Sequence, residues 1–311
     1  MIILDRYSKE RPINMPSKSE KTKARILHDL FEPIAANVYF SPVVQEEYKK
    51  LGLAYLPGYF CSRSAAMGEL PGEVVASIFA VFNPAIVIPS VSQGWAITKR
   101  DAILKARLSG ASASLSEILE LGDADGLVMV ERAAELLLEA SKSLQLAFHP
   151  MFAGLISLEV PQDPFGRLFR GADLLREHRG DSHSAAWTVH GVDGVEISLL
   201  SELYWGIPLK SYVFTRGWSP DEIDQAIIRL LDRHLIDTKD NLTTEGFELR
   251  ESIEKATDLA EESSILALGE NYDELVSLLS PMANKIVEKG GYPSNPTSFG
   301  EILRRRLSNS N

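Results

Sequence analysis

The residues of this chain that could carry chemistry concentrate in one short stretch, residues 174–190. Three of the six histidines lie there, and charged residues are interleaved with them. Histidine can exchange a proton near neutral pH, and arginine can bind a carboxylate or phosphate with two parallel hydrogen bonds. The stretch therefore predicts either a site that moves protons or binds an anion, or a buried ionic network. The residues concerned are His178, His183, His190, Arg176, Glu177, Arg179 and Asp181.

Helix-forming residues and a helical period predict a helix here, either continuous or bent at Gly180. On a continuous helix, steps of three and four residues place side chains on one stripe. A helix that meets a core usually offers it aliphatic side chains, so titratable groups on such stripes need a function or buried partners. One stripe holds Arg179, His183, Trp187 and His190, and its neighbour holds Glu177, Asp181 and Ser184.

The catalytic candidates are His178, Asp181 and His183. Asp181 lies three residues after His178, so its carboxylate could orient or charge-stabilise that imidazole as a general acid–base. A metal site would need a fourth ligand, and His178 and His183 are five residues apart, which points them to different faces of a straight helix. We therefore predict no metal ligands. Haem ligation stays open and the cofactor is unknown. A nucleophilic serine at Ser182 or Ser184 would lack the usual G-x-S-x-G pattern.

The candidates for ligand binding are Arg63, Arg179, Tyr59 and Trp187. Arg179 and His183 are four residues apart and could clamp a carboxylate or phosphate. Arg63 and Tyr59 belong to the first half of the chain and could face this cluster across a cleft. Aromatic walls with a few converging polar groups are typical of a small-molecule pocket. The competing interpretation is an ion network that holds two halves together, and the sequence leaves both open.

Composition is typical of a cytoplasmic globular protein. The chain has 311 residues, 45% hydrophobic and 24% charged, and its single cysteine, Cys61, excludes an intrachain disulfide. The apolar start is too short for a signal peptide. The longest apolar run, residues 74–91, is interrupted by Asn83, Pro84 and Pro89, which predicts a buried helix and a loop and no membrane span. The formal net charge of −11 lowers the expectation of nucleic-acid binding.

Helical periodicity dominates from residue 22 onward, and no long alternating strand pattern occurs. An internal duplication repeats at about 147 residues, with matches in three places. Residues 28–31 match 172–175, residues 71–74 match 220–223, and residues 118–122 match 265–269. The pattern predicts a flexible arm over residues 1–18, a first half over 19–145, a linker over 146–169 and a second half over 170–311.

The second half carries the clearest local pattern. Ser219-Pro220-Asp221-Glu222 is typical of a helix start with a capping box. A polar turn and Leu242-Thr243-Thr244-Glu245-Gly246 lead into a long helix over residues 247–263. This order resembles the MarR-type winged helix, in which the leucine and threonine close the wing and the glycine leads into the dimerisation helix. The resemblance implies a mostly α-helical, tandem MarR-like winged-helix duplication, a monomer that acts as a single-chain pseudo-dimer.

Three further motifs lie along the chain. They are Gly58-Tyr59-Phe60-x-x-Arg63-x-Ala65-x-Met67-Gly68, then Phe82-Asn83-Pro84, and then residues 174–183. Together they resemble the SalK-like helix-turn-helix family of actinobacteria, whose members often sit beside genes of specialised metabolism. The biochemical role of that family is poorly defined. The resemblance therefore implies a fold and descent from transcriptional regulators, and it supplies no reaction.

The residues that would read DNA are unusual for such a regulator. Outward positions of the predicted recognition helix, residues 221–236, hold four acidic and two basic side chains, and phosphates would repel that face. Its counterpart in the first half, predicted as one apolar helix over residues 71–87, is followed by Asp101 in place of the glycine. We expect a small-molecule-binding, regulator-like protein whose DNA binding is weakened or lost. The alternative is an enzyme of specialised metabolism that uses the polar cluster between the halves.

Overall fold

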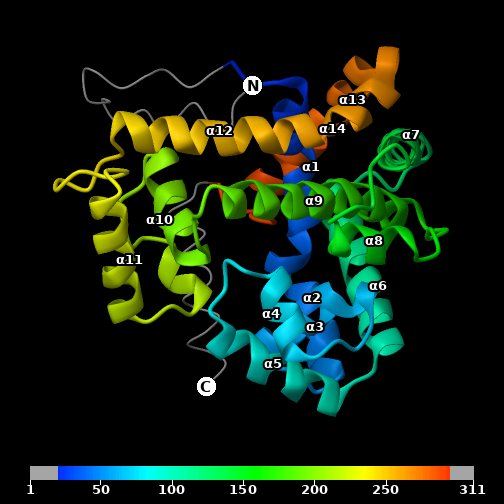
Figure 1. The fold of residues 1–311 in the computed structure, drawn as a ribbon. Coiled ribbons are helices and arrows are strands. Elements are labelled where there is room, and N and C mark those ends of the chain that lie inside the picture. Colours follow the sequence, from blue (N-terminus) through cyan, green and yellow to red (C-terminus); the bar gives the residue numbers. More distant parts are fainter. Residues whose placement is uncertain (1–19, 295–311) are drawn as a thin grey trace.

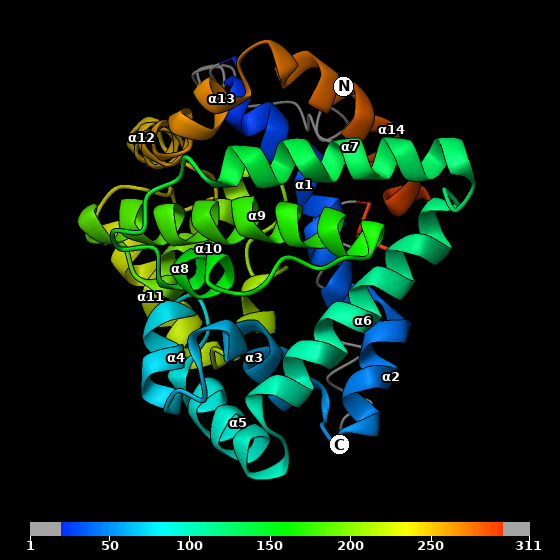
Figure 2. The same ribbon diagram turned by 90° about the vertical axis from the view of Figure 1, so that its right-hand side faces the viewer.

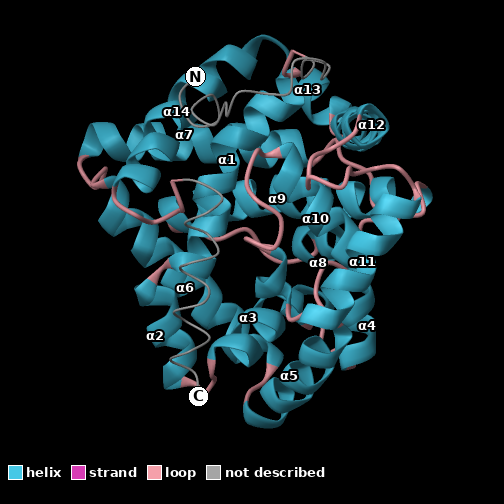
Figure 3. Ribbon diagram, turned by 90° about the vertical axis from the view of Figure 1, so that its left-hand side faces the viewer, coloured by secondary structure: helices cyan, strands magenta, loops and turns pink. Residues whose placement is uncertain are grey.

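The computed structural model describes residues 20–294, and α-helices make up most of them (Figures 1 and 3). The first part of the chain forms α1 (Lys23–Phe40), α2 (Pro42–Lys50), α3 (Tyr55–Ser64), α4 (Gly72–Ile78), α5 (Pro84–Ile97), α6 (Arg100–Leu119) and α7 (Ala124–Ser141). The rest forms α8 (Pro150–Ile156), α9 (Pro164–Val189), α10 (Gly194–Tyr204), α11 (Pro220–Asp232), α12 (Thr244–Ala260), α13 (Glu262–Leu268) and α14 (Tyr272–Glu288). The prediction of a mostly α-helical protein is confirmed. The predicted arm, residues 1–18, lies outside the described residues, and no helix among residues 20–294 is long and apolar enough to cross a membrane.

Helix α9 lies at the centre of the fold and is buried along most of its length (Figures 1 and 2). Its N-terminus is capped by Asp163, which accepts from the N–H of Gly166, and Pro164 occupies the first turn. The helix runs unbroken past Gly180, so the predicted stripes exist without a bend. Helices α1, α6, α7, α8 and α12 pack around it. Gly171 permits the close approach of α7, since a Cβ there would lie 2.7 Å from the Cβ of Leu137.

The two parts of the chain are interlocked through their outer helices. Helix α1 packs along α14, and α9 packs along α7. Helix α12 also contacts α1, and α6 contacts α9, so each of these pairs joins the first part of the chain to the second. At one of these contacts, the hydroxyl of Tyr272 donates to the carbonyl of Lys23 over 3.0 Å. Because each part covers the apolar faces of the other, one core extends from Leu27 in α1 to Ile286 in α14.

The segment from the end of α9 to the start of α12 forms a head with a second hydrophobic core. Trp187, Ile223 and Phe247 are among its buried members. Ser219 caps α11, and Glu222 returns a hydrogen bond to the backbone of Ser219, so the predicted capping box is confirmed. The head therefore folds around α10 and α11 as a unit beside the main core.

After α11 the chain makes a minimal hairpin in the place predicted for a wing. Ile236 and Leu242 form an antiparallel bridge, the one β pairing among residues 20–294. Thr243 then caps α12 by accepting from the N–H of Gly246. A Cβ at Gly246 would lie 1.9 Å from the carbonyl oxygen of Leu235, so the glycine of the L-T-x-x-G motif lets α12 start against the end of the α11 segment.

The prediction of a single apolar helix over residues 71–87 is wrong. The structure divides this segment into α4 and α5, with a turn between Phe79 and Asn83. Pro84 disfavours helical backbone at the residue before it, and Asn83 instead caps α5 by accepting from the N–H of Ala85. The segment predicted as a linker, residues 146–169, contains α8 and the first turns of α9.

Candidate functional site

Helix α9 presents charged or polar side chains on three faces, and each face meets different helices. Asp173, Glu177 and Asp181 share one face. His178 and Ser182 share the second, and Arg179 and His183 share the third. A helix buried on all sides is usually apolar all round, so these groups need partners from the helices around them. The structure supplies partners to each face separately.

The first face meets the arginine–tyrosine cluster, which consists of Tyr39, Arg63, Arg107, Asp173, Arg176 and Glu177. Arg63 on α3 binds Glu177 with two hydrogen bonds, Nε to Oε1 at 2.9 Å and Nη2 to Oε2 at 2.7 Å. Arg176 donates to Glu177 over 2.7 Å, and Arg107 on α6 binds Asp173 over 3.0 Å. Arg63 thus reaches α9 from the first part of the chain, as expected. Tyr59 accepts from Arg63 over 3.2 Å and lies beside it.

Within the arginine–tyrosine cluster, the neighbouring arginines keep the carboxylate of Glu177 ionised. Burial on its own would raise the pKa of Glu177, but Arg63 and Arg176 lower that pKa to about 2. The guanidinium carbons of Arg107 and Arg176 lie 5.2 and 5.0 Å from the centre of the Tyr39 ring, within the range of a cation–π contact. Burial raises the pKa of the Tyr39 hydroxyl above its usual range, so this group stays protonated. The cluster ties α1, α3, α6 and α9 together.

The second face carries two stacked histidines. The rings of His149 and His178 are parallel to within 3°, with centres 3.8 Å apart. Nδ1 of His178 lies 2.7 Å from the carboxylate of Glu261, the residue between α12 and α13. The Nε2 atom of His178 is buried and has no hydrogen-bond partner within residues 20–294. Nε2 of His149 lies 2.9 Å from the hydroxyl of Ser182.

The protonation of His149 follows from its neighbours. Its Nδ1 lies 2.6 Å from the carbonyl oxygen of Ala147, and because a carbonyl accepts, this nitrogen carries the proton. Burial and His178 lower the pKa of His149, so its Nε2 is an acceptor, and the Ser182 hydroxyl beside it also lies 3.0 Å from the carbonyl oxygen of His178 and 3.1 Å from Glu261. Sequence reasoning missed His149 and Glu261. His149 lies in the segment predicted as a linker, and nothing in the local pattern connects either residue with α9.

Asp181 does not make the predicted contact with His178, and this pairing is corrected. Its carboxylate accepts from the N–H groups of Met151 and Phe152 at the start of α8, over 3.0 and 3.2 Å. Glu261 holds His178 instead. Burial and the neighbouring carboxylate of Glu177 raise the pKa of Asp181 to about 7, although the two N–H groups oppose this shift.

We expect Asp181→Asn to remove a pH dependence of stability between about pH 4 and pH 7. An unfolded aspartate has a pKa of about 3.9, so between that value and about 7 the folded protein binds the proton more tightly. The resulting stabilisation is full below about pH 4 and is lost as the pH rises through 7. Urea denaturation gives the free energy of unfolding at about pH 5 and pH 8. Between these values wild type should lose a few kcal/mol more of it than Asp181→Asn does. An equal difference at both pH values would contradict this expectation.

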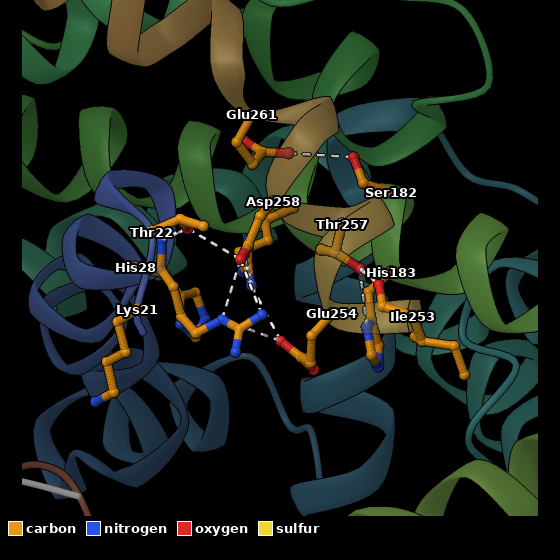
Figure 4. Close-up of polar contacts among 12 residues, drawn as sticks. Lys21, Thr22, His28, Ser182, His183, Ile253, Glu254, Thr257, Asp258 and Glu261 are labelled. Carbon is orange, nitrogen blue, oxygen red and sulfur yellow. Dashed lines mark hydrogen bonds and ion pairs between the residues drawn. The ribbon is translucent and has the colours of Figure 1, made fainter. Parts of the chain in front are cut away.

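The third face of α9 meets α1 and α12 in an ion network (Figure 4). Arg179 pairs with Asp258 over 2.8 Å and with Glu254 over 3.3 Å. Arg25 on α1 pairs with the same Asp258 over 2.9 Å. The predicted arginine clamp thus holds two carboxylates of the protein itself.

His183 lies on the same face as Arg179. Its Nδ1 lies 3.3 Å from the hydroxyl of Thr257. Burial and Arg250 lower the pKa of His183 to about 3. Its ring is therefore neutral at physiological pH.

The predicted site residues therefore lie in separate places rather than in one cleft. Arg63 lies in the arginine–tyrosine cluster with Tyr59 beside it, and Trp187 lies in the core of the head. Their predicted roles in catalysis and ligand binding stay predictions.

Two spaces lie beside the arginine–tyrosine cluster and the head. A cavity of about 10 Å³ lies against the arginine–tyrosine cluster, lined by Ser62, Ala66, Leu104, Arg107, Leu108, Leu155, Leu158, Phe169, Arg170 and Asp173. An open groove of about 410 Å³ beside α11 is lined by Leu209, Lys210, Asp224, Ile227, Ile228 and Asp240.

The start of α11 touches the start of α5. The backbone N–H of Asn83 donates to the carbonyl of Arg216 over 2.8 Å, and its side-chain amide donates to Glu222 over 3.0 Å. The indole N–H of Trp218 donates to the carbonyl of Val81 over 3.0 Å. We call this set of contacts the head clasp. It joins two segments that the sequence assigns to different halves.

The sequence model of a helix-turn-helix family matches residues 24–293 of this chain. No curated protein and no solved structure matches it. The match spans both parts of the chain, from the start of α1 to just beyond α14.

Proposed function

The chain belongs to a helix-turn-helix family, and we propose that it is a small-molecule-binding, regulator-like protein built as a single-chain pseudo-dimer. Membership of such a family suggests a DNA-binding regulator. The contact between the starts of α5 and α11 bears on how this chain could bind DNA. In this proposal the second half keeps a complete winged head. The first half keeps the corresponding helices without the wing.

The crossed packing of the outer helices supports the pseudo-dimer. In this proposal α1 corresponds to α9, α6 to α12 and α7 to α14, and each of these helices packs against a partner from the other half. We propose that α5 corresponds to α11, because each follows a capping residue and begins with proline, Asn83-Pro84 in one and Ser219-Pro220 in the other. This pairing differs from the sequence match of residues 71–74 with 220–223. The wing then has no counterpart, since two residues separate α5 from α6, Thr98 and Lys99.

The head clasp is the observation that carries the proposal of weakened DNA binding. Two-fold regulators insert their recognition helices into successive major grooves, about 34 Å apart. Here the starts of α5 and α11 are joined through Asn83, which binds Arg216 and Glu222 directly. Two helix starts in contact cannot occupy successive grooves. We infer that DNA is contacted through one head or not at all.

The charges on α11 support the same conclusion. Its arginines turn toward the start of α10: Arg229 pairs with Glu196 over 2.8 Å, and Arg233 pairs with Glu196 over 3.4 Å. The exposed acidic residues of the helix, Asp221, Asp224 and Asp232, stay on its outer face. Phosphate contacts supply most non-specific affinity for DNA, so this face repels the duplex.

We expect the double substitution Asp224→Lys, Asp232→Lys to strengthen non-specific DNA binding on the order of tenfold at low salt. Wild type should bind weakly. Each new phosphate contact should steepen the slope of log affinity against log salt by about 0.9. Fluorescence anisotropy of a labelled duplex over a salt titration measures both quantities.

A matched control makes the same charge change on α7, with Glu135→Lys, Glu139→Lys. Both glutamates are exposed and pair with neighbours on their own helix, so they lie away from the head. This variant should leave the affinity close to that of wild type. Tight, salt-sensitive binding by wild type that the α11 substitutions leave unchanged would overturn the proposal.

The groove beside α11 supports the small-molecule part of the proposal. Its volume, about 410 Å³, lies within the range of about 300–1,000 Å³ that is usual for ligand sites. It combines apolar walls with the Asp224–Lys210 ion pair and the carboxylate of Asp240, so a ligand there would touch both α11 and the turn that follows it. Native mass spectrometry of the purified protein, which would reveal a co-purified metabolite, tests this part.

The unpartnered nitrogen of His178 favours a second candidate function, an acid–base enzyme. When Nδ1 donates to Glu261, the Nε2 lone pair of a neutral imidazole can take up a proton from a substrate. We infer that this nitrogen would act as the general base. His178→Gln with His183→Ala tests the predicted site: a change in melting temperature with unchanged ligand binding would remove this candidate.

A further inference from the structure

The small cavity beside the arginine–tyrosine cluster is bordered by two buried arginines from different helices. Arg107 on α6 is 5% exposed and Arg170 on α9 is 7% exposed, and both line the space of about 10 Å³. The Nη1 atom of Arg107 and the Nε atom of Arg170 have no hydrogen-bond partner in the part of the chain that the structure describes. Buried guanidinium donors without an acceptor are costly, so an acceptor is expected between them.

One other nitrogen of each arginine already has a partner. Nη2 of Arg107 binds Asp173 and the hydroxyl of Tyr39, and Nη1 of Arg170 donates to the carbonyl of Glu159. Asp173 is therefore the one carboxylate lining the cavity, and Arg107 uses both of its oxygens. Burial lowers the pKa of Arg170, and although Asp173 opposes this shift, the positive charge of Arg107 adds to it.

The wider surroundings carry an excess of buried positive charge. Arg63 and Arg176 share Glu177, and Arg176 also reaches Glu32 over 2.9 Å. Four guanidinium groups, counting Arg107 and Arg170, thus face three carboxylates, Asp173, Glu177 and Glu32, while the carboxylate of Asp181 binds backbone N–H groups of α8 instead. A water molecule in the cavity would accept hydrogen bonds and leave this excess uncompensated.

We propose that the cavity between α6 and α9 binds one monatomic anion, chloride, held by Arg107 and Arg170. Its small volume favours a single monatomic anion over phosphate and other polyatomic anions. Leu155, Leu158 and Phe169 form the apolar wall on the other side. A bound halide would neutralise the excess charge where α3 and α8 meet the central helix.

The test compares thermal unfolding of the full chain in sodium chloride, sodium bromide and sodium gluconate at matched ionic strength. Chloride and bromide should raise the melting temperature by roughly 2–4 °C with a saturable dose dependence, because they bind the folded state, and gluconate, which cannot enter, should not. Arg170→Gln should abolish the halide-specific rise. The control Arg167→Gln, one turn earlier on α9 and paired with Glu131 at the surface, should keep it.

Diffraction from crystals grown in bromide gives an independent readout on wild type, which matters if Arg170→Gln does not fold. An anomalous peak between Arg107 and Arg170 supports the site. A peak without anomalous signal means a water molecule and overturns the proposal. Identical melting curves in bromide and gluconate overturn it as well.

Discussion

Replacing Glu177 by alanine is expected to lower the free energy of unfolding by about 3–5 kcal/mol, because it removes one partner of a buried ion pair. Glu177 is 1% exposed and accepts from Arg63, Arg176 and Tyr39. Without its carboxylate, two buried guanidinium groups lose a shared acceptor. Urea denaturation of wild type and Glu177→Ala measures the loss.

Two further variants distinguish the effect of losing the ion pair from the effect of losing side-chain volume. Arg63→Met combined with Glu177→Leu replaces the pair by apolar groups of similar size, and this change should cost clearly less than the sum of its single substitutions. At the surface, Glu135→Ala removes one of the two carboxylate partners of Arg132, since Glu274 remains, and should cost about 0–1 kcal/mol. A loss for Glu177→Ala as small as for Glu135→Ala would contradict the expectation.

Gly246→Ala is expected to destabilise the head by about 1–3 kcal/mol, the usual range for overpacking. The added Cβ would lie 1.9 Å from the carbonyl oxygen of Leu235 and 2.8 Å from its carbonyl carbon. Both are backbone atoms, so relief requires moving the end of the α11 segment away from α12. Hydrogen exchange should therefore increase in α11 and the wing more than in α7 and α9, which belong mainly to the other core.

Gly180→Ala is the matched control, and its effect should have the opposite sign. A Cβ at Gly180 would meet one atom within 4 Å, Oε2 of Glu177 at 3.9 Å, which is an ordinary contact. Because a glycine inside a helix costs about 0.5–1 kcal/mol relative to alanine, this substitution should stabilise α9. Equal destabilisation by the two substitutions would show that steric contact with Leu235 is not the cause.

Several features of the fold could be predicted because they depend on neighbours in sequence. The capping box at Ser219 and Glu222 involves residues three apart. The helical nature of residues 174–190 follows from their period, and the turn that leads into α12 follows from its motif. Apolar periodicity continues through the turn inside residues 71–87, so the pattern predicts one helix there. Asn83 and Pro84 do indicate an interruption, but the segment after them, predicted as a loop, forms α5.

What the sequence by itself determined is that residues 174–190 carry an unusual set of charged side chains and that the second part of the chain holds a capped helix followed by a turn into a long helix. The sequence could not determine which residues contact these charged side chains. His178 and Glu261 are 83 residues apart, and Arg63 and Glu177 are 114 apart. Such contacts depend on how helices cross, which apolar packing over the whole core decides. Tertiary structure alone therefore gave each face of α9 its partners, turned Asp181 toward α8 and joined the starts of α5 and α11 through Asn83.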